Sequence, residues 1–244
     1  MDSLAGSVAL VTGASRGFGR EISLRLAAEG VRVVAAASPR SAGLLAALVQ
    51  QIRASGGTAV WHTMDVRRPE QCSALVEQAV EEMGALHILV NCAGLGHWVS
   101  VENTTDAQWL QTMEVNVNGT FYMCRAAIGP MRAAGRGHIV NISSVLGRRG
   151  VPNFAAYCAS KAAVTAFSEA LSKEVKEDGI QVTVISPGTA ATGFRDGHAG
   201  RPLDRALTDP ERMLLPEDVA SAVLWALRTS RHVSALQLLL EPLG

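Results

Sequence analysis

The chain has 244 residues, of which 48% are hydrophobic and 18% are charged, and its formal net charge at pH 7 is zero. This composition is typical of a globular protein and excludes a disordered one. The balanced charge argues against a nucleic acid partner and against binding to an anionic membrane surface. The length allows one sizeable core, and no linker, repeat or low-complexity segment divides the sequence. We therefore expect residues 1–244 to form a single domain.

Short apolar segments rich in β-branched residues alternate with longer helical segments along the chain. Strands are expected at residues 8–13, 31–37, 58–66, 86–94, 137–144, 180–188 and 235–242, and helices at 18–30, 41–57, 69–84, 106–134, 153–178 and 216–230. The strands are almost wholly apolar, which indicates burial on both faces of a parallel sheet. The alternation predicts an α/β fold: a Rossmann-type, doubly wound parallel sheet of about seven strands with helices on both faces.

One segment, residues 189–215, is irregular and polar. Loops of this length in a compact domain are usually functional. We expect this segment to form a loop over the substrate.

The cysteines and the N-terminus bear on the cellular compartment. Cys72, Cys92, Cys124 and Cys158 are scattered, with no CxxC pair and no histidines at metal-ligand spacing, so we expect free thiols and no metal site. The first ten residues lack the features of a signal peptide, and no apolar segment approaches the roughly twenty residues that span a bilayer. These features predict a cytoplasmic protein.

The first expected strand runs into TGASRGFGRE, which contains Gly13, Gly17 and Gly19. Glycines allow a tight turn and a close approach to a pyrophosphate, and the helix that follows offers free N–H groups and a positive dipole end. A glycine-rich turn alone is weak evidence, but this one lies between a first strand and a first helix, as a dinucleotide loop requires. We therefore predict dinucleotide binding here over a plain turn.

The residues after the second strand indicate which dinucleotide is bound. NAD sites place an acidic residue there to hold the ribose 2′-hydroxyl. This chain instead has Ala36, Ala37 and Ser38, followed by Arg40, and Arg16 lies inside the glycine loop. Two guanidinium groups suit a 2′-phosphate, so NADP is expected in preference to NAD. The alternative is that both arginines are solvated surface charges.

The glycine spacing is GxxxGxG, with Thr12 before it, and it resembles the short-chain dehydrogenase/reductase family in its short, soluble branch. MDV at residues 64–66 and NCAG at 91–94 resemble family motifs in the same order, with Cys92 replacing an asparagine described as structural. The resemblance implies cofactor contacts from Gly13, Ser15, Arg16, Gly17, Phe18, Gly19, Ser38, Arg40, Asp65, Val66, Asn91, Ala93, Gly94, Tyr157, Lys161, Pro187, Gly188 and Thr192.

The segment AAYCASKAAV, residues 155–164, places one of the two tyrosines of the chain four positions before a lysine. On a helix, Tyr157 and Lys161 share one face. A free phenol has a pKa of about 10, and a nearby ammonium favours the phenolate. We therefore expect Lys161 to lower the pKa of Tyr157 and to make the phenol a usable acid or base near neutral pH.

Further residues match the family in its own order and complete a catalytic set of Asn116, Ser144, Tyr157 and Lys161. The resemblance implies that Ser144, thirteen residues before Tyr157, binds the substrate oxygen. It implies that Asn116 holds a water that links Lys161 to solvent, and that Lys161 also holds the nicotinamide ribose. No GxSxG segment surrounds Ser144, so we do not expect a nucleophilic serine. The histidines, including His97, His138 and His198, are interpreted as structural or surface residues and not as ligands.

These motifs predict an NADPH-dependent carbonyl reductase that is reversible as an alcohol dehydrogenase acting on CH–OH groups. Two alternatives stay open: a dinucleotide sensor without turnover, and isomerase or dehydratase chemistry on nucleotide sugars, whose known members are longer. The substrate is a small-molecule carbonyl compound, for example a 3-oxoacyl thioester, a hydroxy acid or a xenobiotic ketone. The expected pocket wall is mostly apolar and comprises Leu95, His97, Trp98, Leu146, Phe154 and residues 190–195.

Three arginines near that wall, Arg148, Arg149 and Arg195, are candidates to hold a carboxylate or phosphate, although surface arginine is the favoured interpretation. The ending LQLLLEPLG lacks the glycine pair with which many family members close, and the sequence gives no functional account of it. The resemblance also implies a homodimer or homotetramer built on the two long helices.

Overall fold

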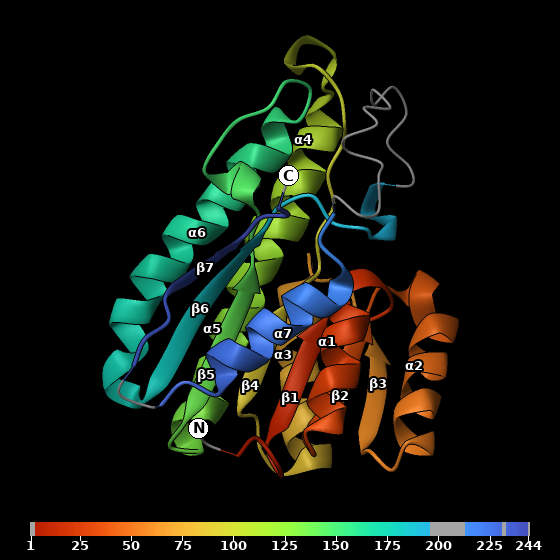
Figure 1. The fold of residues 1–244 in the computed structure, drawn as a ribbon, viewed down its shortest axis with the longest axis vertical. Coiled ribbons are helices and arrows are strands. Elements are labelled where there is room, and N and C mark those ends of the chain that lie inside the picture. The colour runs from red at the N-terminus through yellow and green to blue at the C-terminus, as the bar shows by residue number, and fades with distance from the viewer. Residues whose placement is uncertain (1–2, 196–212, 231–232, 244) are drawn as a thin grey trace.

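The computed structural model describes residues 3–195, 213–230 and 233–243. Within them, seven parallel strands form one sheet in the order β3-β2-β1-β4-β5-β6-β7 (Figure 1). The strands are β1 (Val8–Thr12), β2 (Arg32–Ala37), β3 (Ala59–Thr63), β4 (Ile88–Asn91), β5 (Gly137–Ile142), β6 (Ile180–Pro187) and β7 (Gln237–Leu240). The longer helices are α1 (Gly17–Ala28), α2 (Ala42–Ala54), α3 (Pro69–Met83), α4 (Asp106–Met113), α5 (Gly119–Ala133), α6 (Ala155–Val175) and α7 (Pro216–Leu227).

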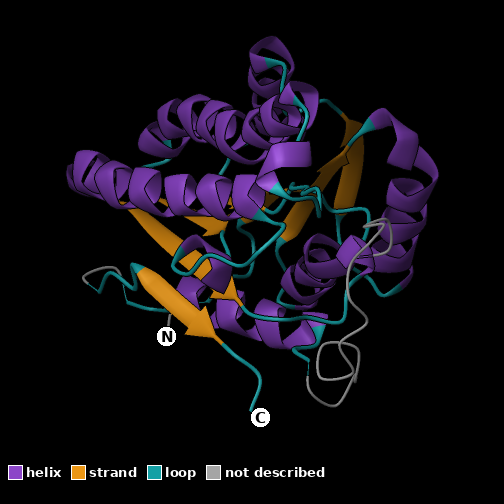
Figure 2. Ribbon diagram, turned by 90° about the horizontal axis from the view of Figure 1, so that it is seen from above, coloured by secondary structure: helices purple, strands orange, loops and turns teal. Residues whose placement is uncertain are grey.

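Helices cover both faces of the sheet, as Figure 2 shows. Residues of α1, α2 and α7 share one hydrophobic cluster with one set of strand side chains, and residues of α3, α5 and α6 share a second cluster with the other set. In β1, Ala9 and Val11 belong to the first cluster, and Val8 and Leu10 to the second. Successive strand residues point to opposite faces, so a strand covered on both sides must be apolar throughout. The predicted doubly wound fold is confirmed.

The strand order places the functional edge of the sheet. The chain moves outward from β1 to β2 and β3, then returns to the other side of β1 with β4. The point between β1 and β4 is therefore the topological switch point, and ligands of such sheets bind at the carboxyl ends of the strands there. Thr12 ends β1, and its Oγ1 accepts hydrogen bonds from the backbone N–H groups of Cys92 and Ala93 at 3.1 and 3.2 Å. These bonds hold the two loops at the switch point together.

The long helical segment predicted at 106–134 has the expected extent but is not one regular helix. A π-helical turn, η3 (Glu114–Asn118), separates α4 from α5. A π-helical turn inserts one extra residue and is frequent at functional sites. Here the turn contains Asn116, whose side chain is hydrogen-bonded to the backbone of Leu95 in the loop after β4. Side-chain contacts between distant segments therefore accompany the irregularity.

The predicted loop at 189–215 is described only at its two ends. The backbone N–H of Ala191 donates to the carbonyl oxygen of Leu214 at 2.8 Å, which brings the two ends together. Residues 196–212 lie outside the described part of the chain, so that part of the prediction stays a prediction. In the described residues, no helix combines the length and apolar character needed to cross a membrane.

Candidate active site

The glycine loop has the backbone geometry of a close-approach turn. Gly13 has a φ of 65°, and a Cβ there would lie 2.8 Å from the backbone nitrogen of Ala93. A Cβ on Gly19 would overlap the carbonyl oxygen of Gly13. Helix α1 begins at Gly17, and its N-cap residue Arg16 makes no side-chain cap. Arg16 therefore does not cap the first N–H groups of α1, and an uncapped helix N-terminus can bind an anion.

The predicted 2′-phosphate residues lie at the ends of adjacent strands. Arg16 follows β1, Ser38 and Arg40 follow β2, and all three side chains are exposed. Within the described residues, neither guanidinium forms an ion pair. Both arginines therefore keep their donors available at the edge of the sheet where the glycine loop lies.

The predicted adenine contact, Asp65, is already paired with a neighbour. Arg67 Nη2 lies 2.6 Å from Asp65 Oδ2, and hydrogen bonding to Arg67 is the main reason that the pKa of the Asp65 carboxyl is lowered. The carboxylate stays ionised and partly exposed, so it remains an acceptor. The next residue, Val66, packs closely against Gly119: a Cβ added to that glycine would lie 2.8 Å from the Val66 side chain.

The remaining predicted cofactor residues differ in how far they reach the surface. The Asn91 carboxamide donates to Asn141 Oδ1 at 2.9 Å and to Cys124 Sγ at 3.3 Å, so this side chain lies in the core. Burial raises the pKa of the Cys92 thiol to about 11, which leaves it un-ionised at neutral pH. The other predicted residues are distributed along the same edge: Ser15 and Phe18 in the glycine loop and at the start of α1, Ala93 and Gly94 after β4, Pro187 at the end of β6, and Gly188 and Thr192 beyond it.

Asn116 is held by contacts on both of its amide atoms. Its Oδ1 accepts from the Leu95 backbone N–H at 2.9 Å, and its Nδ2 donates to the Leu95 carbonyl at 2.8 Å and to Ser160 Oγ at 2.9 Å. The Ser160 hydroxyl in turn donates to the Tyr157 carbonyl at 2.7 Å. Ser160 was not singled out from the sequence. Its position immediately before Lys161 was visible there, but its contact with Asn116, 44 residues away, was not.

Lys161 is 6% exposed, and its ammonium lies under the site. Nζ donates to the Ile142 carbonyl at 2.8 Å and lies 5.6 Å from the centroid of the Tyr157 ring. Helical spacing therefore brings Tyr157 and Lys161 together, as predicted. Burial lowers the pKa of Lys161 to about 8, and a Cys92 thiolate would oppose that shift.

The predicted direction of the Tyr157 pKa shift is wrong. Burial raises the pKa of the phenol above its ordinary value, and a hydrogen bond with Ser144 opposes that rise. The physical reason is that desolvation of a 9% exposed ring outweighs the hydrogen bond with Ser144, while the Lys161 ammonium is directed to a backbone carbonyl. Because its pKa is raised, Tyr157 is a protonated phenol at neutral pH. Its partner Ser144 has two further contacts: Oγ accepts from the Leu146 N–H at 3.1 Å and makes a long hydrogen bond of 3.4 Å to the Pro187 carbonyl.

Aromatic rings surround Tyr157. The Phe154 and Tyr157 rings are stacked with centroids 4.5 Å apart, Trp98 lies 5.0 Å from Phe154, and Phe194 lies 5.5 Å from Tyr157. Trp98 and Phe154 belong to the predicted wall, and Phe194 falls within its range of 190–195. Gly96, which the sequence did not single out, lies against both Phe154 and Tyr157.

The other candidates near the wall have different partners. His97 is hydrogen-bonded to Gln111 at 3.0 Å. Arg149 forms an ion pair with Glu241 at 2.6 Å, so its charge is matched by the C-terminal segment, whereas Arg148 is exposed. The Arg195 side chain lies outside what the structure describes.

Two further predictions concern metal sites and thiols. His138 is buried and hydrogen-bonded to Thr183 Oγ1 at 2.8 Å, and burial lowers its pKa to about 4. In the described part of the chain, no three His, Cys, Asp or Glu side chains form a group that could hold a metal ion. His198 lies outside that part. All cysteines are free thiols, of which Cys72 and Cys124 are buried.

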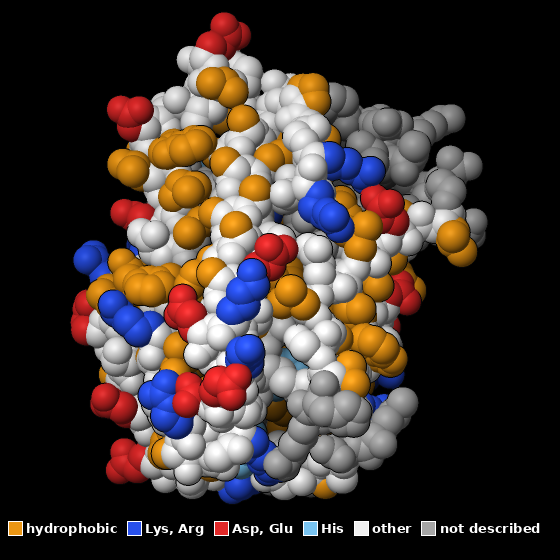
Figure 3. All heavy atoms as spheres, turned by 90° about the vertical axis from the view of Figure 1, so that its left-hand side faces the viewer, with side chains coloured by type: hydrophobic (Ala, Val, Ile, Leu, Met, Phe, Trp, Pro, Cys, Tyr) orange, Lys and Arg blue, Asp and Glu red, His pale blue; other side chains and the backbone are white. Residues whose placement is uncertain are grey.

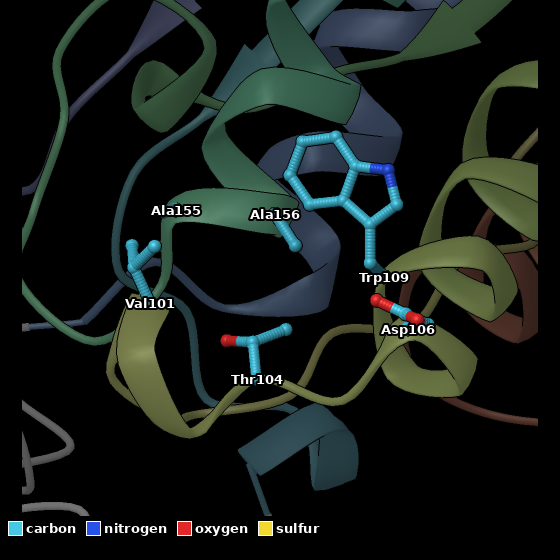
Figure 4. Close-up of a pocket in the computed structure, with 6 residues that line it drawn as sticks. All are labelled: Val101, Thr104, Asp106, Trp109, Ala155 and Ala156. Atoms are coloured by element: carbon cyan, nitrogen blue, oxygen red, sulfur yellow. The ribbon is translucent and has the colours of Figure 1, made fainter.

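A separate hollow of about 190 Å³ lies beside the first turn of α6 (Figure 4). Its lining residues are Val101, Thr104, Asp106, Trp109, Ala155 and Ala156. None of the predicted catalytic residues lines it. We therefore assign the reacting groups to the edge of the sheet and not to this hollow.

Comparisons with known proteins agree with this geometry. The family model described as short chain dehydrogenase matches residues 7–199. A glycine betaine reductase of Emericella nidulans is 37% identical over 241 residues, which is 98% of this chain but 19% of that longer protein. An uncharacterized oxidoreductase of Staphylococcus saprophyticus is 35% identical and is covered over its full length, together with 99% of this chain.

Solved structures give the same result. An alcohol dehydrogenase of Thermococcus sibiricus complexed with 5-hydroxy-NADP has a TM-score of 0.86 and 26% identity, with 97% of this chain and 96% of that one covered. A metagenomic short-chain oxidoreductase in complex with NADP has a TM-score of 0.84 and 30% identity over the full length of both chains. The family predicted from the motifs is thereby confirmed, and the chain belongs to the short-chain dehydrogenase/reductase family of oxidoreductases.

Proposed function

We propose that this protein is an NADPH-dependent carbonyl reductase, reversible as an alcohol dehydrogenase that acts on CH–OH groups. The observation that carries the proposal is the arrangement of Tyr157 at the carboxyl edge of the sheet, with its hydroxyl hydrogen-bonded to Ser144 and the buried Lys161 amine 5.6 Å from its ring centroid. One domain comprising residues 1–244 would hold both the cofactor and the substrate, and segment 189–215 would contribute to the substrate side.

The residues present fit NADPH. A Cβ at Gly13 or Gly19 would overlap neighbouring backbone atoms, so the tight glycine loop at the start of α1 requires glycine there, and the start of α1 is uncapped, as a pyrophosphate site needs. The guanidinium groups of Arg16 and Arg40 would bind the 2′-phosphate, and Asp65 would accept from the adenine. Two related structures hold NADP or a derivative of it, which supports this choice. When bound, NADPH supplies the hydride.

The proton comes from the protein. Because Tyr157 stays protonated at neutral pH, its hydroxyl is already in the form that donates a proton to the carbonyl oxygen as the carbonyl carbon is reduced. Ser144 would donate a hydrogen bond to the same oxygen, exchanging its long bond to the Pro187 carbonyl for a shorter one. The carbonyl carbon gains two electrons, and the oxygen gains the phenolic proton.

Tyr157 must then recover a proton. The pKa of Lys161 is about 8, so this amine exchanges protons readily near neutral pH and is suited to return one. Asn116 would keep this relay in place through its bonds to Leu95 and Ser160. A protonated phenol favours reduction at neutral pH, whereas alcohol oxidation needs the phenolate and should increase at alkaline pH.

The substrate is a carbonyl compound with an apolar substituent. The rings of Trp98, Phe154 and Phe194 give the wall an apolar surface, and Arg149 is paired with Glu241. This wall fits a ketone or aldehyde of small to medium size better than a highly charged one.

We further propose that the protein is a cytoplasmic homodimer or homotetramer. Trp109 and Leu110 of α4 and Phe121 of α5 are exposed apolar side chains, and hydrophobic groups gather on the face that lies to the left in Figure 1 (Figure 3). Exposed apolar patches of this kind mark association surfaces. Light scattering on the purified protein tests this, and a strictly monomeric mass would contradict it.

The function is tested by NADPH oxidation against a panel of ketones and aldehydes, with NADH assayed in parallel. We expect steady turnover with at least one apolar carbonyl compound and a clear preference for NADPH. NADPH binding without turnover on any member of the panel would instead indicate a dinucleotide sensor and would reject the reductase.

A further inference from the structure

Phe154 and Tyr157 form the closest aromatic pair of those described around the site. Their ring centroids are 4.5 Å apart with an interplanar angle of 21°. Phe154 is the N-cap residue of α6, with φ of −140° and ψ of 25°, so it stands outside the helix that carries Tyr157. Both side chains are buried, at 6% and 9% exposure. The face of the phenol is therefore covered by the ring of the residue that caps the helix, whose carbonyl accepts from the Cys158 N–H at 3.0 Å.

Gly96, in the loop after β4, packs against both rings. A Cβ at this position would lie 2.7 Å from Phe154 Cζ and 2.9 Å from Tyr157 Cδ2. Contacts this short are incompatible with any side chain larger than glycine unless the rings move. Gly96 has no positive φ, so glycine is needed here for space and not for backbone conformation.

The two segments that carry these residues are tied together by a backbone bond. The Val99 N–H donates to the Asn153 carbonyl at 2.7 Å. Asn153 is the described non-glycine residue with a positive φ, of 61°, a conformation that costs free energy and is kept only where the surroundings require it. Trp98 packs on Phe154 with centroids 5.0 Å apart. Residues 96–99 and 153–154 thus form a frame around one face of the phenol.

We propose that Phe154 is a positioning residue that fixes the Tyr157 ring for proton transfer, and that Gly96 is glycine because the ring pair needs its space. This inference rests on the proposed function of Tyr157 as proton donor. Ser144 holds the hydroxyl at one end of the phenol, and Phe154 holds the ring face. With both held, the hydroxyl stays at the reacting position, and misplacement by about 1 Å can cost about a hundredfold in rate.

The first test compares Phe154→Leu with Phe167→Leu. Phe167 lies on α6, as Tyr157 does, and pairs with a ring, that of Phe121 at 6.0 Å, but it does not touch Tyr157 in any described contact. We expect Phe154→Leu to lower kcat by about 10- to 100-fold, with the KM for carbonyl and the Kd for NADPH changing by less than about threefold. Phe167→Leu should keep kcat. Equal decreases of kcat in both variants, or a changed KM with an unchanged kcat in Phe154→Leu, would overturn the proposal.

The second test does not depend on turnover. The chain has two tyrosines, so ¹³Cζ-tyrosine labelling gives two NMR signals, and Tyr157→Phe assigns them. In the wild type the Tyr157 signal should keep the chemical shift of a protonated phenol at pH values above the ordinary phenol pKa of about 10. Phe154→Leu admits water to the ring, and the midpoint should move down toward 10. An unchanged midpoint would overturn the proposal even if no carbonyl substrate were found, whereas wild-type inactivity alone counts against the proposed function only.

The third test is a double-mutant cycle with Gly96→Ala. Its added methyl should displace the ring pair and lower kcat while NADPH binding is kept, and it serves if Phe154→Leu is too unstable to assay. Because both changes act through the same ring pair, the double variant should be no slower than about the slower single variant. If the decrease of kcat in the double variant equals the product of the decreases in the two single variants, the two residues act separately and the proposal is overturned.

Discussion

The two ends of the same parallel sheet both bury titratable side chains, but in different ways. At the amino end, His138 is hydrogen-bonded to Thr183, and His87 accepts from the Val8 N–H at 3.0 Å, so one ring nitrogen of each imidazole has a partner within the protein. At the carboxyl end, Tyr157 and Lys161 are also buried, yet they lie beside the loop that a dinucleotide would occupy. Burial lowers the pKa of each histidine and of Lys161 and raises that of Tyr157.

Because groups at both ends of the sheet have shifted pKa values, such a shift indicates that a side chain is buried and does not by itself indicate a function. Burial disfavours the charged form of an acid and of a base alike, wherever it occurs. What distinguishes the carboxyl end is topology, because the switch point between β1 and β4 brings a cofactor loop to the buried groups there. The amino end has no such loop in the described residues, so we assign its histidines to stability.

The largest difference between the two ends of the sheet is expected from a substitution of Ser144. Ser144→Ala removes the hydroxyl bonded to Tyr157, and we expect kcat for carbonyl reduction to fall by about 10²- to 10³-fold with NADPH binding kept. Ser143→Ala is the matched control, because the Ser143 hydroxyl donates to the Lys161 carbonyl at 2.9 Å and does not contact the phenol. Similar steady-state rates for the two variants would remove Ser144 from the mechanism.

The buried His138 at the amino end of the sheet should make the stability of the protein depend on pH. The His138 pKa is about 4 in the folded protein and about 6.5 in the unfolded chain. Below pH 6.5 the unfolded state binds a proton that the folded state refuses, so the free energy of unfolding should fall as pH falls from about 6.5 to 4, by up to about 3 kcal/mol. Above pH 6.5 both states are neutral, and this contribution is constant.

Urea unfolding of the wild type and of His138→Gln between pH 7.5 and 4.5 measures this effect. The variant should lose less stability over that range, because glutamine does not titrate. Parallel pH dependences of the two proteins would show that His138 is not the buried group that refuses the proton.

A smaller effect is expected at the cofactor end of the comparison. The double variant Arg16→Ala/Arg40→Ala should weaken NADPH binding by about 10- to 100-fold, since hydrogen bonds to a charged group contribute about 1.5–3 kcal/mol. NADH binding should change by less than about threefold. Fluorescence titration with both nucleotides measures this. Arg25→Ala is the control, because Arg25 lies on α1, the helix that Arg16 precedes, and is paired with Glu21. Equal losses for both nucleotides would show that these arginines do not bind the 2′-phosphate.

The sequence was sufficient for the fold and for the composition of the site because both depend on local patterns. Apolar segments of strand length separated by helical periodicity imply one parallel sheet, and the four-residue spacing of Tyr157 and Lys161 implies a shared helix face. The glycine loop is recognised by its position between a first strand and a first helix. None of these inferences needs a contact between distant segments.

What the sequence could not provide depends on such contacts. The π-helical turn around Asn116 and the bond from Asn116 to Ser160 join segments far apart in the chain. The expected direction of the Tyr157 pKa shift was wrong because the spacing shows the amine but not the depth of burial or the Ile142 carbonyl that binds the amine. Gly96 escaped notice for the same reason, since only the packed rings show that a side chain does not fit there.

The measurement that bears most directly on the account is single-turnover oxidation of NADPH by a carbonyl substrate in Tyr157→Phe, followed from pH 6 to 9. If Tyr157 is the proton donor, the rate should fall by about 10³-fold at every pH in that range, with the Kd for NADPH unchanged. A rate within a few-fold of the wild type would contradict the account and would require another group to protonate the carbonyl oxygen.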